Sequence, residues 1–224
     1  MAAVSAIITG VSWYKHGRIR GERRRRPPLT HAPRPRRGFA IISEDGMLAD
    51  AARRMDALVF EADQRFYERG LNGVDVIVHG RHSGEQQPRS LARHRLVLTR
   101  NVPAIAPYPS NPNALLWNPA GAALEEALAA LGMPGASLGV IGGADAFTLF
   151  LDRYDVFWLT RAGGVFLPGG YPVFPQVPRL APEDVLSGSG LFPGPARVLD
   201  AANQVTLVPW LRSTGTNPNP AQGR

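Results

Sequence analysis

Short apolar runs alternate with amphipathic segments along this chain, and the pattern predicts strands and helices in alternation. A short apolar run between turn residues is typical of a buried strand, whereas apolar positions three and four apart are typical of a helix. We expect strands at residues 39–42, 76–78, 96–99, 114–117, 138–141 and 156–160. We expect helices at 59–71, 124–131 and 144–151, and a loop or marginal helix at 49–57. This alternation predicts an α/β fold whose mostly parallel sheet is covered by helices on both faces.

The C-terminal part of the pattern predicts antiparallel pairing. Residues 197–199 and 205–210 flank a turn at 200–204, which is typical of a hairpin at the edge of a sheet. The ordered domain is expected to span residues 38–212. We expect residues 1–37, rich in Arg and Pro towards their end, to be a disordered basic extension, and the polar residues 213–224 to be a disordered tail.

The net charge of +7 is concentrated in the predicted extension. Residues 1–37 contain ten Lys or Arg and one acidic residue, so the rest of the chain carries 15 basic and 17 acidic residues and a charge of −2. A basic arm can bind nucleic acid through its phosphates without sequence preference. A disordered extension is the simpler interpretation, and we expect no specific nucleic-acid partner.

Composition excludes several kinds of site. The chain has no cysteine, which excludes disulfides, cysteine metal sites and thiol catalysis. His79 and His82 are three residues apart, but they lie where a strand passes into a turn, so we expect no metal site. No apolar run approaches the ~20 residues of a membrane span. The apolar residues 2–14 precede the arginines, the reverse of a secretory signal, so we expect a cytoplasmic protein without a membrane partner.

Three of the predicted strands end in residues that suit a phosphate. The three ends are Gly80–Ser83, Thr99–Arg100 and Gly142–Gly143. The first is expected to open a helix after its strand, and the third lies between a strand and a helix. Glycines allow a close approach of the backbone to a ligand, and hydroxyl and guanidinium groups bind phosphate oxygens. Taken singly, the glycine pair is more typical of a tight turn, and each arginine is more typical of an ordinary surface residue. Since ligands of parallel sheets bind at the carboxyl ends of the strands, three such ends together favour a nucleotide site.

Asp63 is the candidate proton-handling group. Its neighbours at i+3 and i+4 on the predicted helix are Phe66 and Tyr67, so the carboxyl group would point with them towards the interior. Burial would raise its pKa and make it a usable acid near neutral pH. From these residues alone, an aspartate on the helix surface near Arg65 or Arg69 is equally compatible. Thr160 could hydrogen-bond Asp63 or be an ordinary strand residue.

In chain order, these segments resemble the dihydrofolate reductase family. The resemblance covers about Phe39 to Pro175. The matching segments are Phe39–Leu48 (the first strand and the start of the family's mobile active-site loop), Ala62–Tyr67 (the catalytic helix), Gly80–Ser83 (the Gly-Arg-x-Thr cofactor turn), Ala92–Thr99 (the arginine that holds the folate glutamate and the strand after it), Val140–Gly143 (a glycine pair that carries a cis peptide in the family), Leu159–Thr160 and Phe174–Pro175.

The resemblance implies a dihydrofolate reductase-like enzyme that uses NADPH to reduce dihydrofolate to tetrahydrofolate, as a monomer or homodimer. It implies that Asp63 and Thr160 are catalytic. The implied substrate contacts are Ile41, Phe66, Tyr67, Arg93 and Ile141. The implied cofactor contacts are Leu48, Gly80, Arg81, His82, Ser83, Leu98, Thr99, Arg100, Gly142, Gly143, Ala144, Asp145, Ala146 and Phe147. Among these, Arg81, Thr99 and Arg100 would favour the 2′-phosphate of NADPH over NADH.

The riboflavin-pathway pyrimidine reductases share this fold and are the main alternative, beside other pterin reductases. Ser43–Gly46 resembles their Ser-x-Asp-Gly motif, but Ile141 stands where that family has an acidic residue before its glycine pair. Leu58 lies near the position where dihydrofolate reductases usually have a tryptophan, which alters part of the substrate pocket. A third hypothesis is a nucleotide-binding or nucleic-acid-binding protein that has lost reduction, although such a protein has no need of Asp63, Arg93 and Thr160 together.

Overall fold

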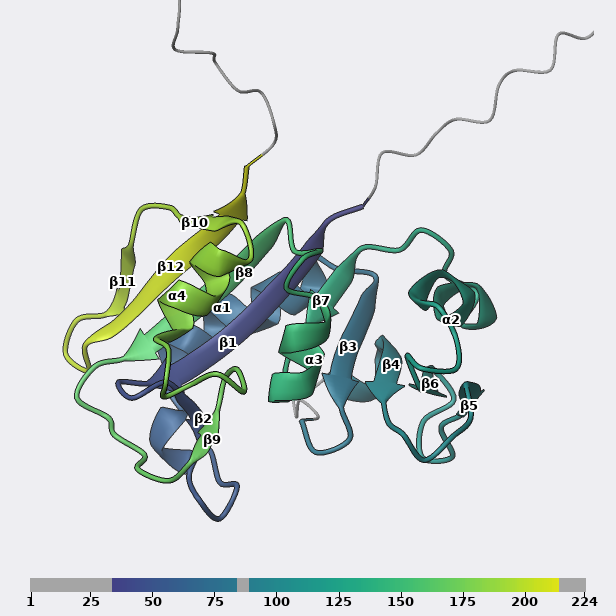
Figure 1. The fold of residues 1–224 in the computed structure, drawn as a ribbon, viewed down its shortest axis with the longest axis horizontal. Coiled ribbons are helices and arrows are strands. Elements are labelled where there is room, and N and C mark those ends of the chain that lie inside the picture. Colours follow the sequence, from purple (N-terminus) through teal and green to yellow (C-terminus); the bar gives the residue numbers. More distant parts are fainter. Residues whose placement is uncertain (1–33, 84–88, 214–224) are drawn as a thin grey trace, which may run out of the picture. The chain divides into compact units, whose positions relative to one another are not determined.

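The computed structural model describes residues 34–83 and 89–213, and in this part of the chain ten strands form one sheet (Figure 1). The strand order is β10-β12-β8-β1-β7-β3-β4-β6-β5, with β11 against β12. The strands are β1 (Arg36–Ser43), β3 (Val76–Gly80), β4 (His94–Leu98), β5 (Ile105–Pro107), β6 (Ala114–Trp117), β7 (Leu138–Val140), β8 (Val156–Ala162), β10 (Leu191–Pro193), β11 (Arg197–Asp200) and β12 (Val205–Arg212). A second, two-stranded sheet pairs β2 (Met47–Ala49) with β9 (Tyr171–Pro172).

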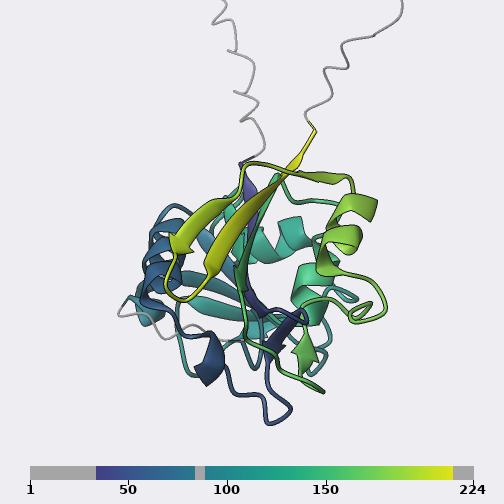
Figure 2. The same ribbon diagram turned by 90° about the vertical axis from the view of Figure 1, so that its left-hand side faces the viewer.

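Helices cover both faces of the large sheet. The helices are α1 (Glu61–Asn72), α2 (Leu124–Ala130), α3 (Ala144–Leu149) and α4 (Pro182–Gly188), with short 3-10 helices η1 (Asp56–Leu58) and η2 (Ser90–Ala92). Figures 1 and 2 show α1 on one face and α3 and α4 on the other. Figure 2, which views the sheet closer to its edge, separates the two layers most clearly.

The central strands are parallel, and each contains a short apolar run. β8, β1, β7, β3, β4 and β6 pair in parallel from one to the next. Strands in such a position are buried on both faces, which explains their continuous apolar runs. Their carboxyl ends meet at one edge of the sheet. The predicted mixed, mostly parallel sheet with helices on both faces is therefore confirmed.

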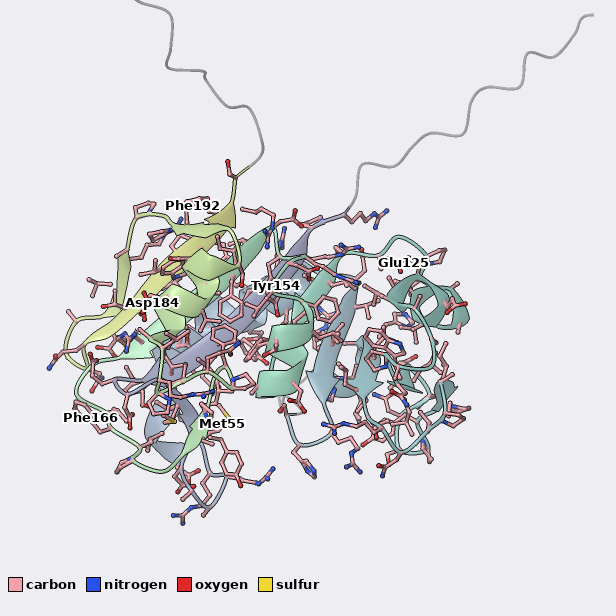
Figure 3. The ribbon with its side chains drawn as sticks, in the orientation of Figure 1. Met55, Glu125, Tyr154, Phe166, Asp184 and Phe192 are labelled. Carbon is pink, nitrogen blue, oxygen red and sulfur yellow. The ribbon has the colours of Figure 1, made fainter. Side chains whose placement is uncertain are left out.

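Two apolar clusters hold the layers together. The larger one contains Phe147, Phe157 and Phe174 and lies on the face of α2, α3 and α4. Tyr154, labelled in Figure 3, is completely buried in it. The smaller cluster, centred on Phe39, joins α1 to the opposite face. Gly70 allows this close approach, since a Cβ there would lie 2.4 Å from the Phe39 ring.

The predicted C-terminal hairpin is confirmed as β11 and β12, which pair in antiparallel register. β12 also pairs in antiparallel register with β8, so it continues the sheet beyond the parallel strands. β1 begins at Arg36, two residues before the expected start of the domain. Residues 1–33 of the predicted N-terminal extension and all but the first residue of the predicted tail lie outside the described residues.

Several local predictions differ from the structure. The predicted helix at 59–71 begins only at Glu61, and Val59 is 58% exposed outside it. Of the loop or marginal helix expected at residues 49–57, the structure has the loop, between the end of β2 and the start of η1. Arg81 and His82 form a turn and do not open a helix. Among the described residues, no helix combines the length and apolar character needed to cross a bilayer.

Candidate active site

Asp63 lies on the buried side of α1, with 9% of its surface exposed. Burial raises the pKa of its carboxyl group to about 6, although a hydrogen bond with the Thr160 side chain partly opposes this rise. The alternative of a surface aspartate paired with a neighbouring arginine is wrong. Arg65 instead binds Glu61 on the exposed side of the helix, with Nη1 and Oε1 2.5 Å apart. An acid with this pKa exchanges protons readily near neutral pH.

Thr160 is held in the middle of the sheet. It is 2% exposed on β8, where it faces Ile41 of β1 on one side and Leu207 of β12 on the other. Backbone pairing on both sides therefore fixes the position of its hydroxyl group next to α1. Asp63 and Thr160 are called the acid end below.

The aromatic residues of α1 pack against the sheet. Phe66 approaches Trp158 of β8, with ring centroids 5.2 Å apart. Tyr67 meets Phe39 edge-on at 6.3 Å. Tyr67 and Ile141 pack against the same small cluster as Phe66. The structure thus gathers four of the five predicted substrate residues around α1, namely Ile41, Phe66, Tyr67 and Ile141.

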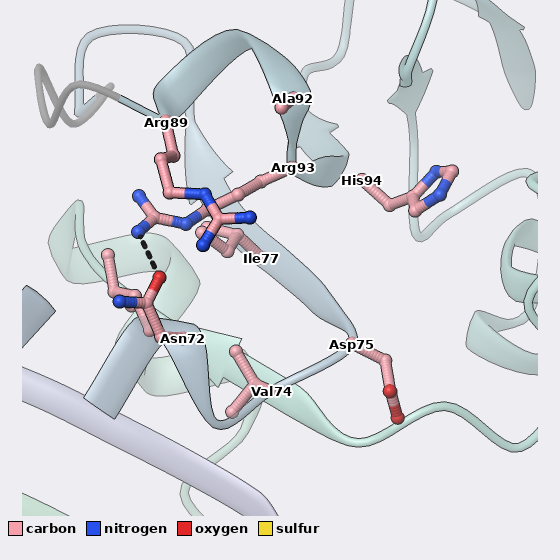
Figure 4. Close-up of a pocket in the computed structure, with 9 residues that line it drawn as sticks. Asn72, Val74, Asp75, Ile77, Arg89, Ala92, Arg93 and His94 are labelled. Atoms are coloured by element: carbon pink, nitrogen blue, oxygen red, sulfur yellow. Dashed lines mark hydrogen bonds between the residues drawn. The ribbon is translucent and has the colours of Figure 1, made fainter. Parts of the chain in front are cut away.

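Arg93, the fifth, lies at the far end of α1. It lines a cavity of about 210 Å³, and its Nη2 donates to Oδ1 of Asn72 at 2.8 Å (Figure 4). Figure 4 shows Arg89 beside Arg93 in this cavity. At 1.5 Å per residue, Asn72 lies roughly 14 Å along the helix from Asp63. Sequence reasoning missed Asn72, although a polar residue before Gly73 at a predicted helix end is a recognisable signal.

The ends of β3 and β7 are in direct contact. The Gly80 amide donates to the Gly142 carbonyl at 3.0 Å, and the Ser83 amide donates to the Gly80 carbonyl at 3.0 Å. Gly142 and Gly143 have φ of +139° and +77°, a backbone region that favours glycine. A Cβ on Gly143 would lie 3.3 Å from the Ser83 hydroxyl oxygen. The resemblance to dihydrofolate reductases implies a cis peptide bond between these glycines, and this expectation is wrong. The cis peptide bond among the described residues is Val177–Pro178.

The end of β4 meets the start of α3. Arg100 and Asp145 form an ion pair with Nη2 and Oδ2 3.3 Å apart, and their side chains are 87% and 81% exposed. Thr99 is buried, and its Oγ1 accepts from the Asn101 amide at 3.1 Å. The structure therefore brings together the three predicted strand ends. We call Gly80–Ser83, Thr99–Arg100 and Gly142–Asp145 the phosphate edge.

The other predicted cofactor residues are more buried. The Phe147 side chain is completely buried against Phe157, with ring centroids 5.2 Å apart, and Ala146 is buried beside it on α3. Leu98, at the end of β4, and Leu48, in β2, are half-buried. The side chains of Phe147 and Ala146 thus anchor α3, and the exposed groups of the edge come from the turns.

A buried cation near these strand ends was not predicted. Arg95 on β4 is 4% exposed and donates from Nη2 to the carbonyl and hydroxyl oxygens of Ser90, at 2.7 and 2.8 Å. The Nδ1 of His79 donates to the Gly80 carbonyl at 2.8 Å, which leaves Nε2 to face Arg95 at 3.4 Å. In residues 34–83 and 89–213, no three His, Cys, Asp or Glu side chains gather as metal ligands do.

No protein-family model matches the chain, and no curated protein sequence matches it. Solved structures do match. A riboflavin biosynthesis protein from Shewanella sp. PV-4 aligns with a TM-score of 0.57 and 20% identity, over 80% of this chain and 99% of that protein. Dihydrofolate reductase from Enterococcus faecalis, complexed with NADP(H) and RAB-propyl, aligns with a TM-score of 0.55 and 18% identity, over 80% of this chain and 96% of that enzyme.

A two-function enzyme gives a similar match. The diaminohydroxyphosphoribosylaminopyrimidine deaminase/5-amino-6-(5-phosphoribosylamino)uracil reductase of Thermotoga maritima aligns with a TM-score of 0.56 and 14% identity. The alignment covers 81% of this chain but only 57% of the Thermotoga protein. At these identities the likeness concerns the fold, and the chain has the dihydrofolate reductase-like fold that riboflavin biosynthesis proteins share.

Proposed function

We propose that this protein is an NADPH-dependent reductase of a pterin, with dihydrofolate as its substrate. When bound, NADPH supplies the hydride. The protein supplies the group that holds the proton, and it orients the two ligands. Asp63 holds a proton at its carboxyl group, where it can support protonation of the ring nitrogen next to the reduced C=N bond.

The observation that carries this proposal is the burial of one carboxyl group against the Thr160 hydroxyl. A buried acid without a cationic partner costs free energy, so its retention in an apolar setting needs a reason. A pKa of about 6 leaves Asp63 partly protonated at neutral pH, which suits a group that must hold a proton and then release it. The apolar side chains of α1 beside it suit the flat ring of a pterin.

The residues of the phosphate edge fit a nucleotide cofactor. Gly142 and Gly143 add no side chain to this edge, and a Cβ on Gly143 would lie 3.3 Å from the Ser83 hydroxyl oxygen. Arg100 is almost fully exposed and forms its ion pair with an exposed carboxylate, so it can turn to a phosphate at small cost. Arg81, also exposed, would add a second cation for the 2′-phosphate.

Arg93 supports a substrate with an anionic tail. A ring held next to Asp63 would place its tail along α1 towards the cavity of Arg89 and Arg93. Two guanidinium groups there suit a carboxylate. This arrangement is consistent with the glutamate of dihydrofolate.

A pyrimidine of riboflavin biosynthesis is the second candidate. Two of the three structures compared carry riboflavin-pathway names or activities, and this chain has the Ser-x-Asp-Gly sequence at Ser43–Gly46. The same cavity would then receive a phosphate instead of a carboxylate. The two substrates therefore differ in the ring that must fit beside Asp63.

The test is NADPH oxidation by the purified protein, with dihydrofolate and with the phosphoribosylaminopyrimidine as alternative substrates. We expect rapid turnover with dihydrofolate that methotrexate inhibits and that Asp63→Asn slows strongly. Glu61→Gln, which removes an exposed carboxylate of the same helix, is the matched control and should turn over normally. Turnover only with the pyrimidine would replace the substrate, and no oxidation with either would reject the proposal.

A further inference from the structure

A second cavity lies between helix α1 and the amino-terminal ends of β1 and β8. Its volume is about 560 Å³, and small-molecule sites typically measure roughly 300–1,000 Å³. On the strands it is lined by Arg37 and Phe39 of β1, which face Val156 and Trp158 of β8 in the sheet register. It shares no lining residue with the cavity of Arg93. We call it the aromatic cavity.

Aromatic rings form the apolar part of this cavity. Phe66 of α1 and Trp158 of β8 are half-buried and pack edge to face, with ring centroids 5.2 Å apart and an angle of 67° between the rings. Phe39, which is buried, lies 6.4 Å from Phe66 between ring centroids. Leu211 of β12 also lines the cavity and is 46% exposed. Leaving such apolar surface open to water costs free energy, and an apolar hollow with a polar rim is typical of a ligand site.

Guanidinium groups surround these rings. Arg69 of α1 lines the cavity, is exposed, and forms no ion pair within the part of the chain that the structure describes. Arg37 donates from Nη1 to the Gly73 carbonyl at 3.1 Å, which leaves its other nitrogens for a ligand. Arg197 of β11 adds a third cation, because its Cζ lies 5.8 Å from the centre of the Trp158 ring.

Among the described residues that line the aromatic cavity, Asp155 is the acidic one. Its Oδ2 accepts a hydrogen bond from the Arg36 amide at 2.7 Å, so the backbone already holds this carboxylate. Within the described structure it forms no ion pair with Arg37 or Arg69. Three guanidinium groups thus stand against one carboxylate, and the charge around the cavity favours an anion.

The two kinds of surface together define the chemistry of the ligand. A flat ring can stack against Trp158 or meet Phe66 edge-on, as aromatic pairs prefer. A carboxylate on that ring can accept two parallel hydrogen bonds from a guanidinium group such as that of Arg69. A cationic ligand would be repelled, and a neutral one would gain nothing from the guanidinium groups.

We propose that the aromatic cavity is a second small-molecule site, which binds a planar aromatic carboxylate. The site lies beside the acid end. Trp158 is two residues before Thr160 on the same face of β8, and Phe66 follows Asp63 by about one helical turn. The proposal is independent of the reductase activity, because none of its steps uses a cofactor or a pterin.

The experiment titrates the full ¹⁵N-labelled chain with naphthalene-2-carboxylate and follows the indole N–H signals of the tryptophans by NMR. The Trp158 signal, identified with Trp158→Phe, should shift saturably with a Kd of about 1 mM or tighter. Trp117 and Trp210 are 2% and 4% exposed and line neither cavity, so their signals should stay in place. Naphthalene-2-carboxamide, a neutral molecule of nearly the same shape, should bind about tenfold more weakly.

Matched variants locate the carboxylate of the probe. Arg69→Gln should raise the Kd of naphthalene-2-carboxylate about tenfold and leave that of the carboxamide unchanged. Arg65→Gln, on the exposed side of the same helix, and Arg93→Gln, in the other cavity, should change neither value.

Three results would overturn the proposal. They are a Trp158 signal that does not shift up to about 10 mM probe, equal binding of the carboxylate and the carboxamide, and an unchanged Kd in Arg69→Gln. A Trp158 signal that moves with protein concentration in the absence of probe would show that a second copy of the chain covers this face. That result would also overturn the proposal.

Discussion

The acid end is buried and paired from several sides, whereas the phosphate edge is built from exposed turns. Asp63 and Thr160 are 9% and 2% exposed, and β8 is held by strands on both sides. The side chains of Arg100, after β4, and Asp145, in the first turn of α3, are 87% and 81% exposed and form an ion pair with each other. Folding fixes the side chains of the acid end in place. The charged side chains of the phosphate edge can still rearrange around a ligand.

This difference predicts different consequences of mutation. At the acid end a substitution changes a buried titrating group, so it alters rate and stability together. At the phosphate edge a substitution removes a solvated charge, so it alters ligand preference and leaves stability unchanged. The following predictions test this contrast, from the largest expected effect to the smallest.

Asp63→Asn should lower the rate of hydride transfer at neutral pH by about 10²- to 10⁴-fold, because it removes the proton-handling group. Single-turnover oxidation of NADPH measures this rate without interference from product release. The control Glu61→Gln should stay within about twofold of wild type. Equal losses in both variants would assign the effect to helix α1 as a whole.

The same substitution should stabilise the protein at higher pH. The pKa of Asp63 rises from 3.8 to about 6 on folding, so its contribution to stability is full below pH 3.8 and is lost as the pH rises through about 6. That rise corresponds to about 3 kcal/mol. The asparagine side chain of the Asp63→Asn variant cannot ionise, so this variant does not lose that stability. It should therefore unfold at higher urea concentration than wild type above about pH 6.

Urea unfolding of the two proteins over a range of pH checks this prediction. Their stabilities should diverge as the pH rises and run parallel above about pH 7. A difference that does not depend on pH would mean that Asp63 is not titrating in the folded protein near pH 6.

Arg93→Gln should raise the KM for the pterin about 10- to 100-fold and leave kcat little changed, since it removes a charged contact to the substrate tail. Arg65→Gln, on the exposed side of α1, is the control and should change neither constant. A fall in kcat without a change in KM would place Arg93 outside the substrate site.

Arg100→Gln should have the smallest effect, a loss of roughly tenfold or less in the preference for NADPH over NADH. Its urea midpoint should equal that of wild type, because the ion pair with Asp145 is exposed. The ratio of kcat/KM for the two cofactors measures the preference. A lower urea midpoint for Arg100→Gln would show that the ion pair of the phosphate edge stabilises the fold. The proposed difference between the two regions would then be wrong.

The same contrast explains how much could be predicted from the sequence. The buried strands β1, β3, β7 and β8 and helix α1 were predicted because continuous apolar runs and helical spacing report burial directly. β2, β9 and β10 were missed, since each has only two or three residues and depends on a distant partner. α4 was missed in a segment rich in Pro and polar residues.

For the site, the sequence left Asp63 undecided between a buried acid and a surface carboxylate. The spacing to Phe66 and Tyr67 was compatible with both, because Arg65 and Arg69 offered partners on the other side. Only the packing of α1 against β8 decides the matter. The hydrogen bond from the Leu167 amide to Asp45 could not be predicted for a similar reason, because Leu167 lies 122 residues away in the sequence.

The most direct test of the central claim is the pH dependence of single-turnover hydride transfer from NADPH to dihydrofolate, in wild type and in Asp63→Asn. If Asp63 must be protonated, the wild-type rate should be highest below about pH 6 and fall about tenfold per pH unit well above it. Asp63→Asn should be slower and should lack this decline. Superimposable profiles, or a wild-type rate independent of pH, would contradict the role of Asp63 as the proton-handling group of a pterin reductase.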